Sequence, residues 1–191
     1  SQLGLGNDGM FSLTLDPADP DTIWGGTYNG LVKSVDGGKT WADSSKGMPK
    51  EQWPFSVAID ETDTNILYVV TKNGQNKGFC DRNEFCGVVM KSIDGGKNWT
   101  KIMAGLSEMS EYYCLVIHPL KPKTLFVNGT TGVYVSHDAG ATWNPLVDGL
   151  PTSFNPVRDN VAQNLILSTD KKSLYLGLHG FGAWRLDLAA F

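Results

Sequence analysis

The strongest constraint on the fold of this chain is an eight-residue phrase that occurs three times. The copies run from Ser34 to Trp41, from Ser92 to Trp99 and from Ser136 to Trp143, and each reads Ser-x-Asp-x-Gly-x-(Thr/Asn)-Trp. The Asp can accept hydrogen bonds from the backbone N–H groups that follow it, the Gly permits a positive φ, and the hydroxyls can bind the remaining groups of a turn. Apolar-rich residues precede every copy, and the Trp begins the segment that follows. The phrase therefore predicts a self-contained turn between two β-strands, repeated along the chain.

The repeated phrase resembles the Asp-box, or BNR, repeat of β-propellers. Its one strong departure is Asn98, which stands where Thr is usual. The wider unit, from Phe11 to Trp24, is more similar to the group of sortilins, xyloglucan-cleaving glycosidases and the photosystem II assembly factor than to sialidases. Each Asp has turn N–H groups to accept, so we expect a structural rather than a catalytic role for the repeated positions. These are Ser34, Asp36, Gly38, Trp41, Ser92, Asp94, Gly96, Trp99, Ser136, Asp138, Gly140 and Trp143.

The resemblance implies an all-β fold, namely a β-propeller segment of four four-stranded antiparallel blades in which each Asp-box is a C–D turn. The first repeat places strands A, B and C at 11–15, 23–27 and 31–34, with strand D from residue 40. The fourth repeat has no Asp-box and no D strand, so its blade is incomplete. We expect a second copy, or the rest of a longer chain, to complete the ring. The whole chain, 1–191, is taken as one domain with blades at about 11–53, 54–111, 112–161 and 162–191.

Composition agrees with this fold and excludes several functions. The 191 residues include 22 Gly and 9 Pro, and 41% of residues are hydrophobic, which suits a turn-rich β protein. The net charge is −4 and no basic run is present, which argues against a nucleic-acid partner. No apolar stretch is long enough to span a membrane. The motifs of cofactor and metal sites are missing too, so we expect neither.

The three cysteines indicate the compartment. Cys80 and Cys86 enclose five residues, a spacing that a loop disulfide can close and that differs from zinc and redox motifs. Cys114 lies in an apolar strand, where a buried free thiol is expected. A disulfide between Cys80 and Cys86 favours an extracytoplasmic setting, either secreted or periplasmic. Two sequons, at Asn98 and Asn128, accept glycans only in a source that makes N-glycans.

Strand parity locates the face that can vary. In an antiparallel meander the A–B and C–D turns share one end of the blade, and the B–C and D–A loops share the other. The chain carries a 14-residue insertion in the B–C loop at about 72–87 and a long D–A loop at 144–164. Length variation on a repeated scaffold concentrates where function is elaborated. We therefore expect the B–C and D–A loops to form a binding face, with Tyr28, Asn29, Trp53, Arg82, Glu108, Tyr112, Arg158, Asp159, His179 and Phe181 as its contact residues.

Two functions fit these observations. The first is a non-catalytic recognition or scaffold module that binds a protein or glycan in an extracytoplasmic assembly. The alternative is a fragment of a polysaccharide-acting glycoside hydrolase related to the xyloglucan-cleaving enzymes, which place a catalytic Asp in a B–C hairpin. The short hairpins here contain no carboxylate, so Asp81 or Glu84 with Glu111 is the best available pair. Sialidase chemistry needs three clustered arginines. The chain has only Arg82, Arg158 and Arg185, and Arg185 lies in a predicted strand, so we do not expect sialidase activity.

Overall fold

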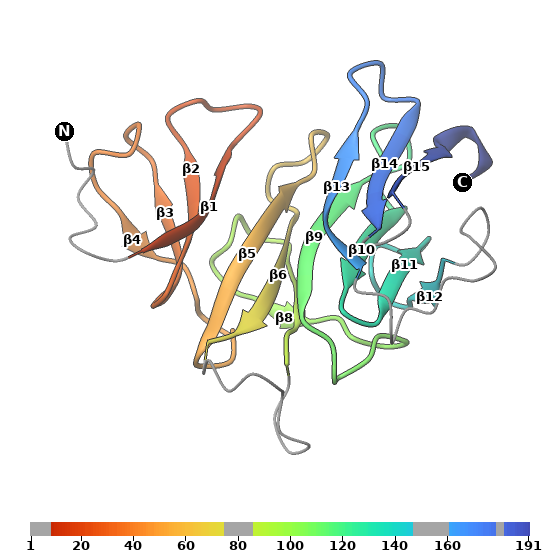
Figure 1. The fold of residues 1–191 in the computed structure, drawn as a ribbon. Coiled ribbons are helices and arrows are strands. Elements are labelled where there is room, and N and C mark those ends of the chain that lie inside the picture. Colours follow the sequence, from red (N-terminus) through yellow and green to blue (C-terminus); the bar gives the residue numbers. More distant parts are fainter. Residues whose placement is uncertain (1–8, 75–85, 147–160, 179–181) are drawn as a thin grey trace.

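The computed structural model describes residues 9–74, 86–146, 161–178 and 182–191, which form four antiparallel sheets arranged as an arc of blades (Figure 1). Blade 1 contains β1 (Met10–Leu15), β2 (Ile23–Thr27), β3 (Gly30–Ser34) and β4 (Ala42–Asp43). Blade 2 contains β5 (Gln52–Ile59), β6 (Leu67–Asn73), β7 (Val89–Ser92) and β8 (Thr100–Lys101). Blade 3 contains β9 (Tyr112–Ile117), β10 (Leu125–Gly129), β11 (Gly132–Ser136) and β12 (Asn144–Pro145). Blade 4 contains β13 (Val161–Leu167), β14 (Ser173–Leu178) and β15 (Gly182–Asp187), followed by the 3₁₀ turn η1 (Leu188–Ala190).

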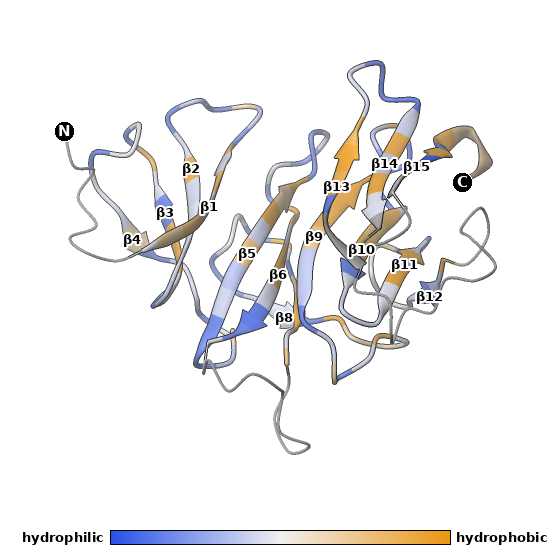
Figure 2. Cartoon of the chain, viewed as in Figure 1, coloured by the Kyte–Doolittle hydropathy of each residue, from blue (hydrophilic) through white to orange (hydrophobic). Residues whose placement is uncertain are grey.

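The order of strands confirms the all-β prediction and the β-propeller type of blade. Each sheet is a meander in which neighbours in sequence pair antiparallel, and the described part of the fourth sheet has three strands. Hydrophilic residues gather in many of the turns that join the strands, whereas β13 and β14 are largely hydrophobic (Figure 2). Blades 1 and 4 lie at opposite ends of the arc, with blades 2 and 3 between them (Figure 1).

The strand register defines equivalent positions in the four blades. Thr14 pairs with Trp24, Ala58 with Tyr68, Val116 with Phe126, and Ile166 with Tyr175. Trp24, Tyr68, Phe126 and Tyr175 therefore occupy equivalent positions on strand B, as the repeat pattern in the sequence predicts. The sequence pattern also aligns Leu165 with Phe11, Phe55 and Tyr113 at the start of strand A, and this prediction is wrong by two residues. The register makes Leu165 equivalent to Leu13, Val57 and Leu115, because each of these pairs with the residue that follows the B-strand aromatic.

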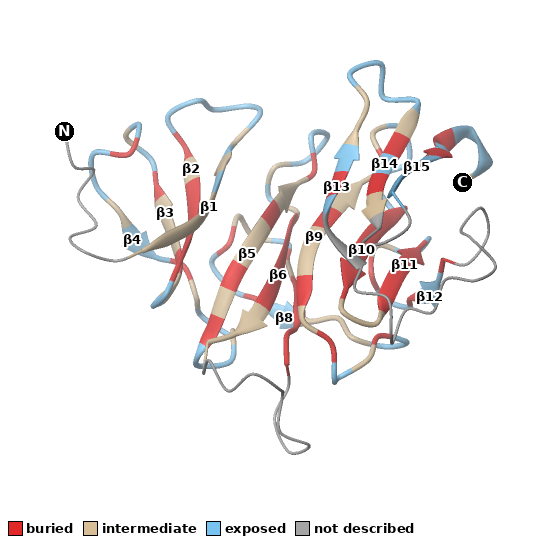
Figure 3. Cartoon of the chain, viewed as in Figure 1, coloured by how far each residue is buried: buried red, intermediate tan, exposed pale blue. Residues whose placement is uncertain are grey.

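The hydrophobic core is divided into three clusters, and each cluster is a joint between consecutive blades. Trp24 and Leu31 of blade 1 pack against Val57, Leu67 and Trp99 of blade 2. The next two joints repeat this pattern between blades 2 and 3 and between blades 3 and 4. Buried residues accordingly concentrate in the strands of the inner blades (Figure 3). Stability therefore comes from face-to-face packing of sheets, as expected for stacked repeats.

Within the described residues, no helix has both the length and the hydrophobicity needed to cross a membrane.

Candidate functional site

Each Asp-box closes on itself through the same set of hydrogen bonds. In the second box the Ser92 hydroxyl donates to Asp94 Oδ1 (2.8 Å) and accepts from the Gly96 N–H (2.9 Å). Asp94 Oδ1 also accepts from the Asn98 N–H (2.9 Å), and its Oδ2 accepts from the Asn98 side-chain amide (2.7 Å). Thr40 and Thr142 make the corresponding bonds in the other boxes through their hydroxyls. Asn98 is thus a functional replacement for Thr, because its amide reaches the same carboxylate oxygen.

These hydrogen bonds explain why the box carboxylates are poor candidates for catalysis. The pKa of Asp94 is lowered to about 2, chiefly by the side-chain and backbone hydrogen bonds from Asn98. The pKa values of Asp36 and Asp138 are also lowered to about 2, in each case chiefly by the Thr of the same box. A carboxylate held ionised by its own turn does not serve as a proton donor near neutral pH. We therefore assign the boxes to structure.

The boxes lie beside the A–B turns, at the end of the sheets that we call the box end. The N–H of Gly37 donates to Asp21 O (2.9 Å), and that of Gly95 donates to Asn65 O (3.0 Å). The third box makes the same bond through Ala139 to Lys123 O (2.8 Å). The parity argument is therefore correct for these turns. The opposite end, which carries the B–C and D–A connections, is called the loop end.

Five aromatic side chains form a continuous array at the loop end. Phe11 lies at its centre, stacked on Trp53 (ring centroids 5.2 Å apart) and on Phe55 (5.2 Å). Tyr28 contacts Phe11 and Trp53 edge-on, at 4.5 and 4.8 Å. Tyr113 extends the array by an edge contact with Phe55 at 6.4 Å. Tyr28 is exposed and the other four rings are partly exposed, so the array presents aromatic surface to solvent.

Charged and polar groups border this array on the side of Tyr113. Glu111 Oε2 accepts a hydrogen bond from the Tyr113 hydroxyl (3.0 Å) and lies 3.5 Å from Lys72 Nζ. The same ammonium group lies 5.8 Å from the centre of the Phe55 ring. Burial and the neighbouring Glu111 carboxylate raise the pKa of Tyr113, so its hydroxyl stays protonated and donates. We call these three neighbouring residues, Lys72, Glu111 and Tyr113, the polar border.

Part of the predicted contact set lies on this end of the blades. Tyr28, Asn29 and Glu108 are exposed, and Trp53 is partly exposed. Tyr112 does not belong with them, because its ring is fully buried and its hydroxyl donates to Ser107 O (2.8 Å). Asp81, Arg82, Glu84, Arg158, Asp159, His179 and Phe181 lie outside the described residues.

Sequence reasoning missed several members of the array and of its border. The sequence pattern places Phe11, Phe55 and Tyr113 only at the starts of A strands, and Lys72 only at the edge of the insertion. Their aromatic character at equivalent positions was the available signal. Because strand A begins at the loop end, aromatic residues there must meet one another near the inner edge of adjacent blades.

The predictions for the cysteines and the two sequons have different outcomes in the structure. Cys86 is buried, and its proposed disulfide partner Cys80 lies outside the described residues. Cys114 is a free thiol that is largely shielded, and burial raises its pKa. Asn128 is fully buried, and its Oδ1 accepts from the Cys114 N–H (2.9 Å), so this sequon is inaccessible in the folded chain. Asn98 is exposed.

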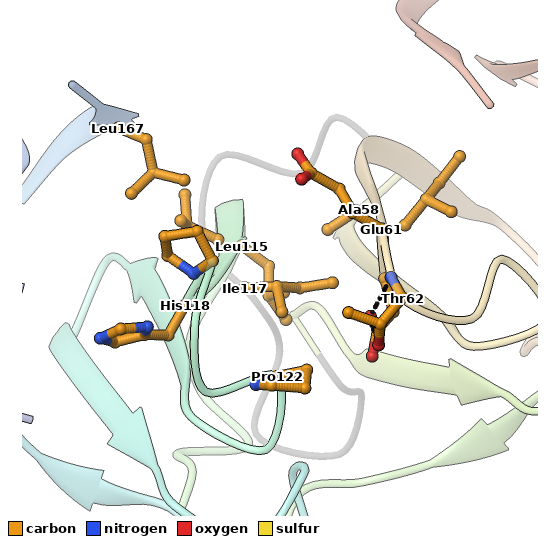
Figure 4. Close-up of a pocket in the computed structure, with 12 residues that line it drawn as sticks. Ala58, Glu61, Thr62, Leu115, Ile117, His118, Pro122 and Leu167 are labelled. Carbon is orange, nitrogen blue, oxygen red and sulfur yellow. Dashed lines mark hydrogen bonds between the residues drawn. The ribbon is translucent and has the colours of Figure 1, made fainter. Parts of the chain in front are cut away.

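The box end contains a pocket of about 210 Å³ between the A–B turns of blades 2 and 3. Its wall is largely apolar, formed by Ala58, Leu115, Ile117, Pro122 and Leu167, with Glu61 at its edge (Figure 4). Both ring nitrogens of the buried His118 in this wall lie within hydrogen-bonding distance of backbone groups. Its Nδ1 accepts from the N–H groups of Leu120 (3.1 Å) and Lys121 (3.2 Å), and its Nε2 lies 3.1 Å from Leu188 O. These bonds give His118 a structural role in the A–B turn of blade 3.

Among the residues with described placement, no three His, Cys, Asp or Glu side chains converge in a way that could hold a metal ion.

Comparison with known proteins supports the repeat and the fold. The model of the BNR/Asp-box repeat matches residues 134–145. A xyloglucanase of Hypocrea jecorina (strain QM6a) is 24% identical over 97% of this chain, which spans 26% of that protein. The GH74 xyloglucanase structure from Xanthomonas campestris superposes with a TM-score of 0.70 at 20% identity, covering 96% of this chain and 29% of its own. The extracellular domain of a one-component system from B. thetaiotaomicron gives a TM-score of 0.68 at 15% identity, covering 95% and 22%.

The chain thus corresponds to about a quarter of the length of these proteins. At this level of identity the likeness to the solved structures establishes the fold alone. Together with the three boxes described above, it identifies the chain as an Asp-box (BNR) repeat segment with a β-propeller fold, similar to xyloglucan-cleaving enzymes.

Proposed function

We propose that this chain is a non-catalytic recognition module that binds a glycan at the loop end of its blades. The observation that carries the proposal is the array of Phe11, Tyr28, Trp53, Phe55 and Tyr113. Aromatic rings that remain partly exposed can cover the C–H faces of sugar rings, and the rigid sheets beneath them reduce the entropy cost of binding. An array drawn from three blades provides room for more than one sugar ring.

The polar border supports the same assignment. Lys72 and the Tyr113 hydroxyl supply donors, and Glu111 supplies an acceptor, immediately beside aromatic surface. Small-ligand sites combine such a mainly apolar lining with a few placed polar groups. The xyloglucanase relative makes a plant β-glucan such as xyloglucan the first ligand to test. An extracytoplasmic location fits this role, because such polysaccharides are met outside the cell.

The glycoside hydrolase alternative rests on the xyloglucanase relatives and on Glu111. Hydrolysis needs a second carboxylate about 5 to 9.5 Å away. Glu111 is already engaged by Tyr113 and Lys72, and its expected partners, Asp81 and Glu84, lie outside the described residues. Reducing-end assays on xyloglucan with the wild type and Glu111→Gln separate the two functions. Turnover that disappears in the variant would favour the enzyme.

Binding is tested by calorimetry and affinity electrophoresis with xyloglucan and its oligosaccharides. We expect Trp53→Ala and Tyr28→Ala each to weaken binding by about tenfold or more, which corresponds to about 1.4 kcal/mol. Leu120→Ala is the control, because Leu120 is also an exposed large apolar residue but lies in an A–B turn at the box end. Absence of binding to any β-glucan, or equal loss in all three variants, would overturn the glycan assignment and leave a protein partner as the remaining role for this face.

A further inference from the structure

The residue that precedes strand A is held in the same way in the first three blades. It lies directly before β1, β5 or β9, and its carbonyl accepts a hydrogen bond from the residue that directly follows strand B of the same blade. These bonds join Gly9 O to the Tyr28 N–H (3.3 Å), Glu51 O to the Gly74 N–H (2.7 Å) and Glu111 O to the Thr130 N–H (3.0 Å). Gly9, Glu51 and Glu111 therefore occupy equivalent positions at the loop end.

Each of these three positions is followed, two residues along the chain, by a ring of the aromatic array. The rings are Phe11, Trp53 and Tyr113. Strand β1 contacts β5, and β5 contacts β9, so the three units follow one another across blades 1 to 3 (Figure 1). Blade 1 has glycine at this position, and the Tyr28 ring fills the space of a side chain, since a Cβ on Gly9 would stand 2.2 Å from it. Blades 2 and 3 instead have glutamate, so two carboxylates accompany the array.

Glu111 shows how a glutamate at this position is held. Thr130 fixes its backbone at two points, because Thr130 Oγ1 also accepts a hydrogen bond from the Glu111 N–H (3.2 Å). The side chain of Glu111 is partly exposed, and its Oε2 contacts both the Tyr113 hydroxyl and Lys72 Nζ. A carboxylate has two oxygens and room for about four hydrogen bonds. Glu111 can therefore accept a ligand hydroxyl as well, with little further loss of conformational freedom.

Glu51 lies beside Trp53 in the corresponding place on blade 2. A Cβ on Gly74 would stand 2.4 Å from Trp53 Nε1 and 2.8 Å from the Glu51 carbonyl oxygen, so Gly74 contacts both residues closely. Glu51 itself is exposed, and Trp53 is partly exposed. The backbone of Glu51 is thus fixed next to the indole ring, at a point of the loop end that is open to solvent.

The backbone of Glu51 has a conformation that favours glycine. Its φ is 60°, and among the described residues other than glycine only Ala139 and Lys171 also have a positive φ. Glycine adopts such a φ without the steric cost that a glutamate bears. Residues strained in this way cluster at functional and ligand sites. The strain therefore distinguishes Glu51 from an ordinary exposed glutamate.

We propose that Glu51 is a specificity-determining residue of the glycan site, whose carboxylate accepts hydrogen bonds from hydroxyl groups of the sugar that covers Trp53. Glu111 does the same for the sugar beside Tyr113, so the ligand is an oligosaccharide that extends over blades 2 and 3. Hydrogen bonds to an ionised carboxylate are shorter and stronger than neutral ones, which lets Glu51 select sugars by the position of their hydroxyl groups. The inference rests on the proposed function and deepens it, because it adds a polar contact on blade 2 to the polar border.

The test compares two glycine substitutions that relieve the same backbone conformation at opposite ends of the blades. Calorimetry measures the binding of xyloglucan oligosaccharides, and thermal melting measures stability. Glu51→Gly weakens binding about tenfold because a charged acceptor is lost, while its melting temperature is unchanged or higher. Ala139→Gly is the matched control, since Ala139 also has φ 60° and lies in a box, where Gly37 and Gly95 occupy the same position. It changes the melting temperature in the same direction and leaves binding unchanged.

A second substitution, Glu51→Gln, retains the shape of the side chain and removes only its charge. It weakens binding about threefold or more, and its loss adds to that of Glu111→Gln in the double variant, because the ligand contacts both residues. Glu61→Gln is the control for loss of a negative charge, since Glu61 is an exposed glutamate in an A–B turn at the box end.

The outcomes separate this inference from the proposed function. If the wild type binds and Trp53→Ala weakens binding, but both folded Glu51 variants bind like the wild type, the inference is overturned and the proposed function stands. Glu51→Gly that loses binding only together with stability, while Glu51→Gln binds normally, assigns Glu51 to structure and also overturns the inference. A wild type that binds no glucan overturns both.

Discussion

The box end and the loop end of these blades differ in how closely their residues repeat from blade to blade. At the box end, Ser, Asp and Thr or Asn repeat almost unchanged, and their polar groups bind one another and the backbone of the turn. At the loop end, the connections differ in length from blade to blade, and partly exposed aromatic rings from several blades meet. Closed turns at one end fix the spacing of the sheets. The other end can then vary its residues without losing the fold.

The box end should be the less tolerant of the two to mutation, and Gly96→Ala tests this most severely. Gly96 has φ +80°, and a Cβ there would meet the Trp24 ring at 2.2 Å and Ser44 Oγ at 3.1 Å. We expect a loss of about 3 kcal/mol in the free energy of unfolding, measured with urea, because both strain and overpacking contribute.

Gly95→Ala is the matched control for that substitution. Gly95 also has a positive φ, of +69°, but the nearest atom to its Cβ position is Asn65 Oδ1 at 3.5 Å. The third box already contains alanine at this position, Ala139, with φ 60°. We expect a loss of about 1 kcal/mol or less. Equal losses in the two variants would show that backbone strain, rather than the joint with blade 1, governs the box.

Acid should loosen the box end first. The pKa values of Asp36, Asp94 and Asp138 are about 2 in the folded chain, below the ordinary value of 3.8. Because the folded pKa is the lower one, the stabilisation is complete above about pH 4 and is lost as the pH falls from about 4 toward 2. Thermal melts across this range should show a falling midpoint. Amide exchange should report opening of the boxes before the strands.

A variant with Asp36, Asp94 and Asp138 all changed to Asn serves as the control for the acid experiment. It should start with a lower melting temperature near neutral pH and show a shallower decline between about pH 4 and pH 2. A decline as steep as that of the wild type would assign the acid sensitivity to other carboxylates.

The sequence was informative about the box end because that end depends on local chemistry. The bounds predicted for strand B of blade 1, 23–27, agree with β2, and the Asp-box bonds follow from residue types within one turn. Tyr112 and Leu165 show where local reasoning stops. Tyr112 begins strand A beside a loop, yet its ring turns into the joint between blades. The equivalence of Leu165 is set by its pairing with Leu176 across blade 4. Both outcomes depend on tertiary packing, which one repeat does not encode.

For the same reason, the sequence indicated only some of the residues in the aromatic array. Trp53 and Tyr28 stood out as aromatic residues in polar segments, whereas Phe11, Phe55 and Tyr113 looked like ordinary strand residues. Their contact depends on the spacing between neighbouring blades. That spacing is set by joints such as Gly96 on Trp24, which become apparent only when sheets are placed face to face.

The smallest effect is expected at the loop end, for Lys72→Met. This change removes the ion pair with Glu111 and the ammonium group near Phe55, but it retains most of the aliphatic side chain. Because Lys72 and Glu111 are both partly exposed, we expect the free energy of unfolding to fall by only about 0.5 kcal/mol. Lys50→Met, at an exposed residue, is the control for general loss of charge. A loss of more than about 2 kcal/mol in Lys72→Met alone would contradict the comparison, because it would make the polar border as structural as the boxes. A small loss in stability combined with weaker glycan binding would instead separate the two ends, one maintaining the fold and the other available for recognition.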